Sequence, residues 1–193
     1  MVERRTAETD ISVELRIDGR GGGEIGTGIP FFDHMLTLLA RHGLFDLTVR
    51  ASGDIEVDYH HTVEDVGLCL GEALACALGD KAGIARYGTA HVPMMDAMAT
   101  VVLDLSGRPN LVYDAPESVS TRSLRGGFDL SLVEEFLKAL SNRAGIDLHV
   151  RLWYGRDLHH CVEAVFKALA RALRAAASID PGIEGVLSTK GKL

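Results

Sequence analysis

The stretch DYHHTVEDVGLCLGEALACAL, residues 58–78, decides the fold because it returns as DLHHCVEAVFKALARALRAAA at residues 157–177. The two copies share an aspartate, two adjacent histidines, a valine and a glutamate at identical spacing. Immediately upstream, RHGLFDLTVRA (41–51) matches RAGIDLHVRL (143–152), so two similar segments occur twice in the same order. An internal repeat of this kind predicts a duplicated architecture.

The duplication predicts two related halves, residues 1–88 and 89–193, which together form one compact unit. In each half, alternating apolar and polar residues predict strands, and helical periodicity predicts helices. Strands are expected at 11–17, 45–51, 91–107, 110–114 and 146–153, and helices at 30–43, 60–78, 128–145 and 159–177. This pattern predicts an α+β fold of two ββαββα-like repeats, with helices packed between two mainly antiparallel sheets.

Composition limits the possible classes of function. Hydrophobic residues make up 47% of the chain and charged residues 24%, which is typical of a globular protein. The formal net charge of −7 disfavours binding to nucleic acid or a membrane surface, because both depend on accumulated positive charge. The sequence shows neither a signal-peptide core nor the roughly 18 apolar residues of a membrane span. We expect a cytoplasmic protein.

The cysteines agree with a reducing compartment. Cys69, Cys76 and Cys161 follow no CxxC spacing and lie within apolar helical patterns. We therefore expect reduced thiols in the core rather than a disulfide framework.

The repeated HHxxE motif places metal-binding side chains on two helices. Residues four apart share a face of a helix, whereas adjacent residues point about 100° apart. His60 and Glu64 can therefore bind one metal ion while His61 points elsewhere. Since the second copy repeats this arrangement, two pseudosymmetric sites are expected, one with His60, Glu64 and His160 and the other with His159, Glu163 and His61.

Each site needs a further ligand. Counting back from the shared DLxVR segments places His34 opposite Glu135, and either residue could complete either site. The sequence also leaves open whether one chain supplies all ligands of a site. Imidazole and carboxylate ligands with open positions suit Mn, Fe or Zn better than Mg or Ca.

The repetition separates these histidines from others in the chain. A lone HHxxE at a helix start is usually a surface or capping feature, whereas its recurrence favours a metal site. His42, His91 and His149 have no such support and are expected to be structural or solvated.

Three aspartates near the motif have alternative interpretations. Asp58 and Asp157 either orient the imidazoles or cap the helices. Asp65 stands opposite Ala164 and is either a functional group retained in one half or an ordinary solvated helix residue.

Several longer motifs follow one another in a fixed order over nearly the whole chain. They are ETDISVELRIDG, GIPFFDHMLTLLARHGLFDLTVRASGD, DYHHTVEDVGLCLGEAL, GIARYG, LDLSGRP, HHCVEAVFKALARALR and LSTKG. In these motifs the chain resembles the imidazoleglycerol-phosphate dehydratase family. The resemblance implies a ribosomal protein S5 domain 2-like fold and a hydro-lyase of L-histidine biosynthesis, which converts imidazoleglycerol phosphate to imidazole-acetol phosphate. It also implies two Mn²⁺ per subunit and a homo-oligomer of twenty-four subunits with sites at subunit interfaces.

The resemblance assigns roles to individual residues. Metal ligands are expected at His34, His60, His61, Glu64, Glu135, His159, His160 and Glu163. Substrate contacts are expected from Glu8, Arg86, Arg108, Ser188 and Lys190, with the arginines and the lysine as a phosphate clamp. Glu8, Glu64 and Glu163 are the expected catalytic residues, with Glu8 and a metal-bound water as candidates for the proton transfers.

Two positions depart from the family pattern, and two other functions remain as alternatives. Glu135 stands where the family often has histidine; because a carboxylate can also bind manganese, activity is expected, while the metal preference stays open. Met95 replaces a usual aspartate, although Asp96 remains beside it. A dimetal hydrolase would release inorganic phosphate, and a metal-storing shell protein would tolerate loss of the clamp.

Overall fold

The structure, a computed structural model, describes all residues from 1 to 193 except 121 and 125. Its first sheet contains β1 (Val2–Arg5), β2 (Thr9–Arg16), β4 (Asp46–Gly53) and β3 (Ile25–Gly26) in that order. The second contains β5 (Tyr87–Met94), β6 (Ala97–Asp104), β8 (Asp147–Tyr154) and β7 (Asn110–Asp114). In each sheet, two antiparallel pairs are followed by one parallel pair, so the expected mainly antiparallel sheets are confirmed.

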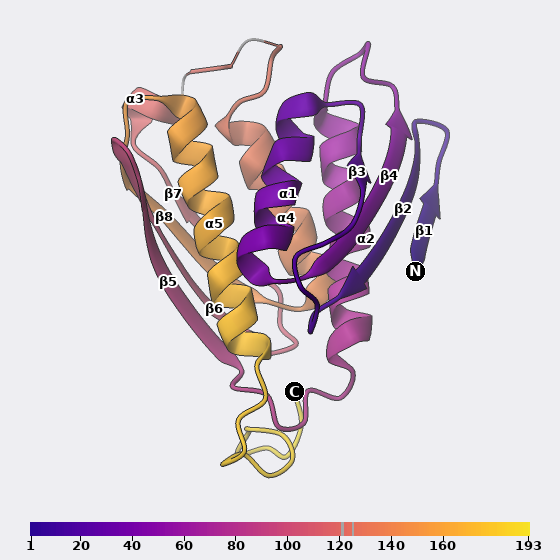
Figure 1. Cartoon of the computed structure of the whole chain (residues 1–193), viewed down its shortest axis with the longest axis vertical. Helices are drawn as coiled ribbons and strands as arrows, with labels where there is room; N and C mark the ends of the chain where they lie inside the picture. Colours follow the sequence, from indigo (N-terminus) through magenta and orange to yellow (C-terminus); the bar gives the residue numbers. More distant parts are fainter. Residues whose placement is uncertain (121, 125) are drawn as a thin grey trace.

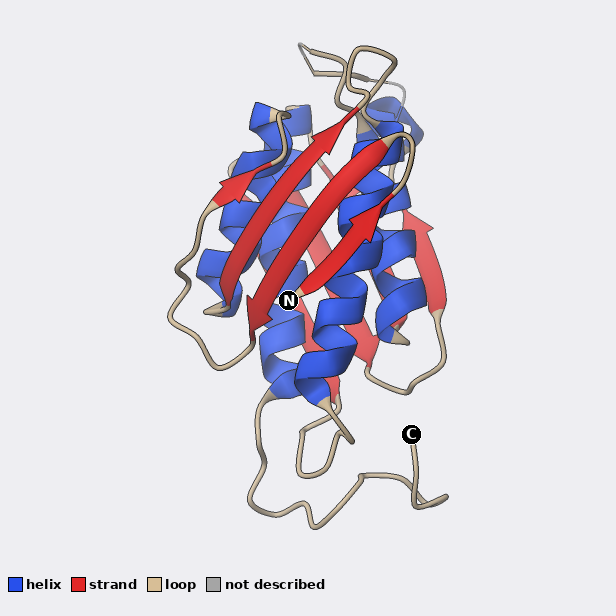
Figure 2. Ribbon diagram, turned by 90° about the vertical axis from the view of Figure 1, so that its right-hand side faces the viewer, coloured by secondary structure: helices blue, strands red, loops and turns tan. Residues whose placement is uncertain are grey.

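Four long helices fill the space between the two sheets (Figures 1 and 2). They are α1 (Pro30–Gly43), α2 (His60–Leu78), α4 (Leu130–Ala144) and α5 (Leu158–Ala177), and a short α3 (Glu117–Ser120) precedes α4. The predicted α+β fold of two similar halves with helices between sheets is therefore confirmed. Among the described residues, none of the helices is both long enough and apolar enough to cross a membrane.

The structure contains three short elements that the sequence did not predict, β1, β3 and α3, and it divides one predicted strand in two. The segment 91–107 was expected to belong to a single strand, but the structure divides it between β5 and β6. Met95 and Asp96 form the turn between them, and Met95 has a positive φ of 50°. The sequence contains no glycine or asparagine here to announce a tight turn. This turn brings the carboxylate of Asp96 to 2.6 Å from Nδ1 of His160, in the second HHxxE motif.

Phenylalanine side chains join the halves in the core. The ring of Phe136 on α4 stacks on Phe166 of α5 at 5.3 Å between centroids and meets Phe32 of α1 edge-on at 5.4 Å. All three side chains are fully buried. Because aromatic burial and ring packing both stabilise a core, these contacts hold α4 against both α1 and α5.

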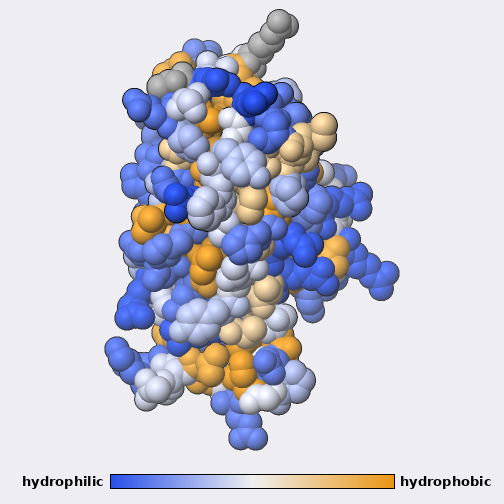
Figure 3. Space-filling model, turned by 90° about the vertical axis from the view of Figure 1, so that its left-hand side faces the viewer, coloured by the Kyte–Doolittle hydropathy of each residue, from blue (hydrophilic) through white to orange (hydrophobic). Residues whose placement is uncertain are grey.

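Outside the core, the two sheets differ in their exposed faces. The first exposes polar residues such as Asp10 and Glu14, as expected for alternating strands. The second exposes Val102, Val112 and Trp153, and Figure 3 shows hydrophobic residues among hydrophilic ones on this side of the molecule.

The expectation for the cysteines holds at two of three positions. Cys69 and Cys161 are buried, and burial raises the pKa of each thiol to about 11. Cys76 was also expected in the core but is exposed, because it lies on the solvent side of α2. All three are free thiols.

We expect Gly67→Val to lower the free energy of unfolding by about 1–3 kcal/mol, as overpacking of a core does. A Cβ atom at Gly67 would lie 2.8 Å from the carbonyl oxygen of Phe136 and 2.9 Å from Cβ of Ala139, so α2 and α4 would have to separate. Urea denaturation measures the change. Gly26→Val is the control, since nothing lies within 4 Å of a Cβ there. Equal effects of the two substitutions would contradict the close helix packing.

Candidate metal centre

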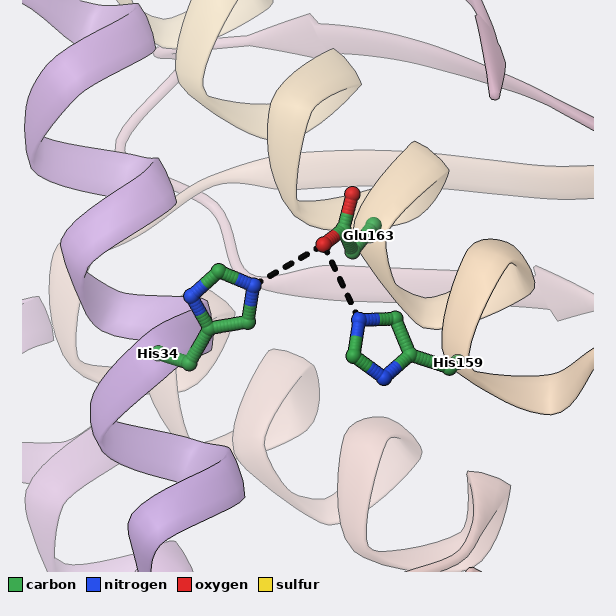
Figure 4. A group of neighbouring side chains, drawn as sticks. All are labelled: His34, His159 and Glu163. Atoms are coloured by element: carbon green, nitrogen blue, oxygen red, sulfur yellow. Dashed lines mark hydrogen bonds and ion pairs between the residues drawn. The ribbon is translucent and has the colours of Figure 1, made fainter. Parts of the chain in front are cut away.

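Three metal-ligand side chains converge between α1 and α5 (Figure 4). Nε2 of His34 lies 2.8 Å from Oε1 of Glu163, and Nε2 of His159 lies 3.1 Å from the same oxygen. Their ligand atoms lie within 4.8 Å of one another, and no other such group of three occurs in the described part of the chain. The packing of α1 on α5 thus groups His34 with the HHxxE motif of the second half, not with that of the first.

Glu163 is held as an anion at this centre. Its side chain is only 8% exposed, and burial by itself disfavours the charged carboxylate. Hydrogen bonds from Lys167, His34 and His159 outweigh burial and lower the pKa of Glu163 to about 2. Nζ of Lys167 donates to Oε2 at 2.6 Å, so one oxygen faces the lysine and the other faces the two imidazoles.

The corresponding residues of the first half are less tightly grouped. Nε2 of His60 lies 3.9 Å from Oε2 of Glu64, which agrees with the expected shared helix face. Glu135 lies on α4, the helix that packs on α2, but its carboxylate contacts Nζ of Lys138 at 3.4 Å. The structure therefore brings His60 and Glu64 together within one chain and leaves Glu135 outside that pair.

The second histidine of each pair is held by a carboxylate from outside its helix. Asp54 contacts Nδ1 of His61 at 3.0 Å, and Asp96 contacts Nδ1 of His160 at 2.6 Å. Such contacts fix the tautomer and orientation of a ring and leave Nε2 available to a metal ion. The hydrogen bond that His61 donates to Asp54 raises the pKa of His61, while hydrogen bonding with His160 lowers the pKa of Asp96.

These partners differ from the two aspartates considered in the sequence. Asp157 is the N-cap of α5 and accepts from the backbone N–H of His159 at 2.9 Å, while its carboxylate lies 4.0 Å from Nδ1 of His160. Asp58 accepts from the backbone N–H of His60 at 2.7 Å. Both therefore serve the helix starts rather than the rings. Asp54 and Asp96 could not be found from helix spacing, because each reaches its histidine from a neighbouring strand end or turn.

Asp96→Asn is expected to weaken metal binding by about 10- to 100-fold, as loss of a ligand-orienting partner typically does. The amide would keep the size of the side chain while losing the charge that orients His160. Titration of the metal-free protein with Mn²⁺ measures the affinity. Asp180→Asn, which changes an exposed carboxylate beyond the end of α5, should leave it unchanged.

Asp65 is neither an exposed helix residue nor part of the metal-ligand group. It is buried and accepts hydrogen bonds from Nε of Arg4, at 2.7 Å, and from the hydroxyl of Thr9. Of the two alternatives for Asp65, the ordinary solvated residue is therefore wrong, because the side chain points toward the β1–β2 hairpin. That hairpin carries Glu8, whose Oε2 lies 3.8 Å from Nδ1 of His61.

The expected phosphate clamp lies at the opposite end of the molecule. A pocket there is lined in part by Arg86, Arg108, Ser188 and Lys190. Arg86 donates two hydrogen bonds to Asp104, at 2.7 and 2.8 Å, and a third to the carbonyl oxygen of Leu187 at 2.6 Å. The HHxxE motifs begin α2 and α5, whereas the clamp surrounds the chain that follows the end of α5 (Figure 1). A helix of 20 residues spans about 30 Å, so the clamp and metal centre of one chain cannot hold the same small molecule.

Sequence reasoning missed Lys167. It follows Glu163 by four positions on α5, so helix spacing alone could have indicated their contact. Lys167 also lies near His42, since its charge contributes, after burial, to lowering the pKa of that histidine. His91 contacts the Thr100 hydroxyl at 2.7 Å, and His149 contacts Asp147 at 3.2 Å.

Comparisons with known proteins identify the family of the chain. The family model described as "Imidazoleglycerol-phosphate dehydratase" matches residues 27–173. The chain is 57% identical over 192 residues to the imidazoleglycerol-phosphate dehydratase of Syntrophus aciditrophicus, covering 100% of this chain and 96% of that protein. It is likewise 56% identical over 191 residues to the enzyme of Alkaliphilus metalliredigens, covering 99% and 96%.

Two solved structures share the fold. The crystal structure of the dehydratase from Staphylococcus aureus superposes with a TM-score of 0.80 at 37% identity, over 92% of this chain and 98% of that one. The dehydratase from Pyrococcus furiosus, in complex with (S)-C348, gives a TM-score of 0.83 at 38% identity over 99% of both chains. Sequence and fold therefore point to the same relatives.

Proposed function

Because the chain belongs to the imidazoleglycerol-phosphate dehydratase family and is a hydro-lyase of histidine biosynthesis, we propose that it uses two manganese ions per subunit to convert imidazoleglycerol phosphate to imidazole-acetol phosphate. The observation that carries the proposal is the convergence of His34, His159 and Glu163. Two imidazole nitrogens and a carboxylate oxygen form a donor set that suits Mn²⁺, Fe²⁺ or Zn²⁺. The residues present thus fit the metal that the activity would use.

We assign the ligands to two sites. The first contains His34, His159 and Glu163, with His61 as a further ligand. The second contains His60, Glu64 and Glu135, with His160 as a further ligand. His61 and His160 lie outside the three-residue group of one chain, yet Asp54 and Asp96 contact Nδ1 of the two rings, which leaves Nε2 as the nitrogen that would bind a metal ion. A neighbouring copy supplying these two rings accounts for both facts.

The protein residues then divide the remaining work. Bound metal ions supply Lewis acidity, which favours the anionic form of an imidazole ring. Glu8 moves protons at the carbon chain of the substrate, because its carboxylate is 55% exposed and lies close to His61. Arg86, Arg108 and Lys190 bind the phosphate, which does not react, and Ser188 adds a hydroxyl donor. Binding through a group that does not react positions the reacting atoms.

A single assay distinguishes this function from its alternatives. The protein is stripped of metal with a chelator, supplied with Mn²⁺ and given imidazoleglycerol phosphate. We expect a ketone product that keeps its phosphate, and about two metal ions bound per chain. Release of inorganic phosphate would identify a hydrolase instead, and a metal content near one would contradict the paired sites.

The separation of clamp and metal centre supports a site shared between copies, and we propose the shell of twenty-four subunits that the resemblance implies. We further propose that the two halves, residues 1–88 and 89–193, act together as one catalytic unit in the cytoplasm. The partner is a small phosphorylated imidazole, since a net charge of −7 disfavours nucleic acid and membrane surfaces.

Mixing two inactive variants tests the shared site. His159→Ala removes a metal ligand and Arg86→Ala removes part of the clamp, so each variant alone should have little activity. If clamp and metal centre come from different chains, oligomers assembled from both variants contain some intact sites and regain measurable activity. The control is the double variant His159→Ala, Arg86→Ala mixed with either single variant, where sites with both parts intact cannot form. Equal activity in the mixture and the control would contradict sharing.

A further inference from the structure

The turns that precede β2 and β6 place acidic residues at equivalent points of the two halves. Glu8 immediately precedes β2, and Asp96 immediately precedes β6. Each carboxylate faces Nδ1 of the second histidine of an HHxxE motif, at 3.8 Å for Glu8 and His61 and at 2.6 Å for Asp96 and His160. The duplication has therefore given both halves an acid beside this histidine.

The two acids differ in how they are held. Asp96 accepts hydrogen bonds from the backbone N–H groups of Arg156 and Asp157, at 2.6 and 2.9 Å, in addition to its contact with His160. The carboxylate of Glu8 accepts no hydrogen bond from the described residues. Asp96 is thus fixed through its own side chain, whereas the side chain of Glu8 stays free to react. The turn that carries Glu8 must therefore be held by another group.

Asp65 provides that other group in the first half. Its carboxylate receives Nε of Arg4 from the end of β1 and the hydroxyl of Thr9 from the start of β2, so it joins both strands of the hairpin to α2. The Asp65 side chain is 9% exposed and that of Arg4 40%, and a hydrogen bond to a charged group is stronger than one between neutral groups.

A second layer of hydrogen bonds continues from Thr9 to Glu8. The hydroxyl of Thr6 accepts from the backbone N–H groups of Glu8 and Thr9, at 3.1 and 3.0 Å, and lies 3.2 Å from the hydroxyl of Thr9. The backbone carbonyl of Glu8 in turn accepts from the N–H of Asp54 at 3.1 Å. Asp65 therefore holds the backbone of Glu8 without contacting its carboxylate.

The second half lacks this anchor. Ala164 occupies the position of Asp65 in the repeated motif and is fully buried. The anchor is thus present only in the half whose turn carries the carboxylate of Glu8. This accounts for the difference between Asp65 and Ala164, which helix packing alone would not require.

We propose that Asp65 is a positioning residue for the dehydration, which holds the β1–β2 turn through Arg4 and Thr9 so that the free carboxylate of Glu8 meets the substrate in a fixed place. The inference rests on the proposed role of Glu8 in proton transfer. It adds a residue that contacts neither metal nor substrate.

Asp65→Asn tests the inference, because it keeps the side-chain shape and removes the charge. We expect kcat to fall by about 10- to 100-fold, since a displacement near 1 Å can cost that much. The KM for imidazoleglycerol phosphate and the Mn²⁺ content per chain should stay within about twofold of wild type. A loss of folded protein would lower metal content and kcat together, so this combination separates positioning from stability.

Combining the substitution with Glu8→Gln gives the decisive comparison. If Asp65 acts through Glu8, Asp65→Asn should change kcat less than about twofold when Glu8 is already Gln, because coupled residues are not additive. Single-turnover measurements with enzyme in excess keep these slow variants measurable. An equal loss in both backgrounds would overturn the inference. If Glu8→Gln alone kept full turnover, the proposed role of Glu8 in proton transfer would be wrong. That outcome can be told apart from failure of the inference about Asp65, in which Glu8→Gln lowers kcat and Asp65→Asn lowers it equally in both backgrounds.

Asp46→Asn is the matched control. Asp46 accepts from the backbone N–H groups of Arg20 and Gly22, at 2.8 and 3.0 Å, and holds a loop at the far end of β4. Its loss should lower the thermal midpoint without changing kcat. Thr9→Val provides a second variant, which removes the hydrogen bond that links Asp65 to Thr9, and through Thr6 to Glu8, without changing α2. It should reproduce the fall in kcat if Asp65→Asn does not fold, and wild-type turnover in a folded Thr9→Val protein would overturn the inference.

Discussion

Glu163→Gln is expected to remove about one metal ion per chain and to abolish most of the turnover. Oε1 of Glu163 is the atom on which His34 and His159 converge, and its second oxygen neutralises the half-buried Lys167. The amide keeps the size of the side chain but loses the negative charge. Loss of a direct ligand should exceed the roughly 10- to 100-fold fall in metal affinity that follows from loss of an outer partner.

Metal analysis and steady-state kinetics measure the two effects together. Glu72→Gln is the matched control, since Glu72 lies on α2 and pairs at 3.0 Å with Arg143 in an ion pair that is about half exposed. An exposed pair contributes little, so this variant should keep its metal and turnover. A Glu163→Gln protein with two metal ions and normal kcat would refute the centre between α1 and α5.

Glu8→Gln is expected to lower kcat by about 10²- to 10⁴-fold, the range typical for loss of a general acid or base. Metal content should remain unchanged, because Glu8 approaches Nδ1 of His61 rather than the Nε2 that a metal ion would use. This pattern differs from that of Glu163→Gln, where metal and activity are lost together.

The rate of the variant should be measured with saturating Mn²⁺ and over a range of substrate concentrations. Glu3→Gln serves as the control, because Glu3 is an exposed residue of β1 in the same hairpin. If the two variants had equal kcat, Glu8 would have no part in proton transfer, and the anchor at Asp65 would have no catalytic purpose.

The repeat in the sequence predicted the parts of the fold that depend on local periodicity. Both HHxxE motifs lie at the start of long helices. The helix α2 begins at His60, and α5 begins at Leu158, one residue before its motif. The contact between His159 and Glu163 followed from helix geometry. The turn at Met95 and Asp96 did not, because nothing in its composition marks a tight turn and the pairing of β5 with β6 imposes it.

The missing parts of the candidate site depend on tertiary contacts. His34 could have served either half until the packing of α1 on α5 placed it beside Glu163. Asp96 reaches His160 from 64 positions away, and Asp54 reaches His61 from the end of β4, seven positions away, which is a spacing that helix periodicity does not indicate. The burial of Asp65 was hidden for the same reason, since the side of a helix that faces a hairpin is known only once the hairpin is in place.

The distance between the clamp and the metal centre has a consequence for how activity depends on protein concentration. If each site combines the clamp of one chain with the metal centre of another, an isolated subunit is inactive. Specific activity should then fall when the protein is diluted to concentrations at which the oligomer dissociates. Over that range of concentration, the reaction rate would rise more steeply than the protein concentration. Newly synthesised chains would have no catalytic activity until they had assembled into the oligomer, so assembly would be the last step in forming the active enzyme.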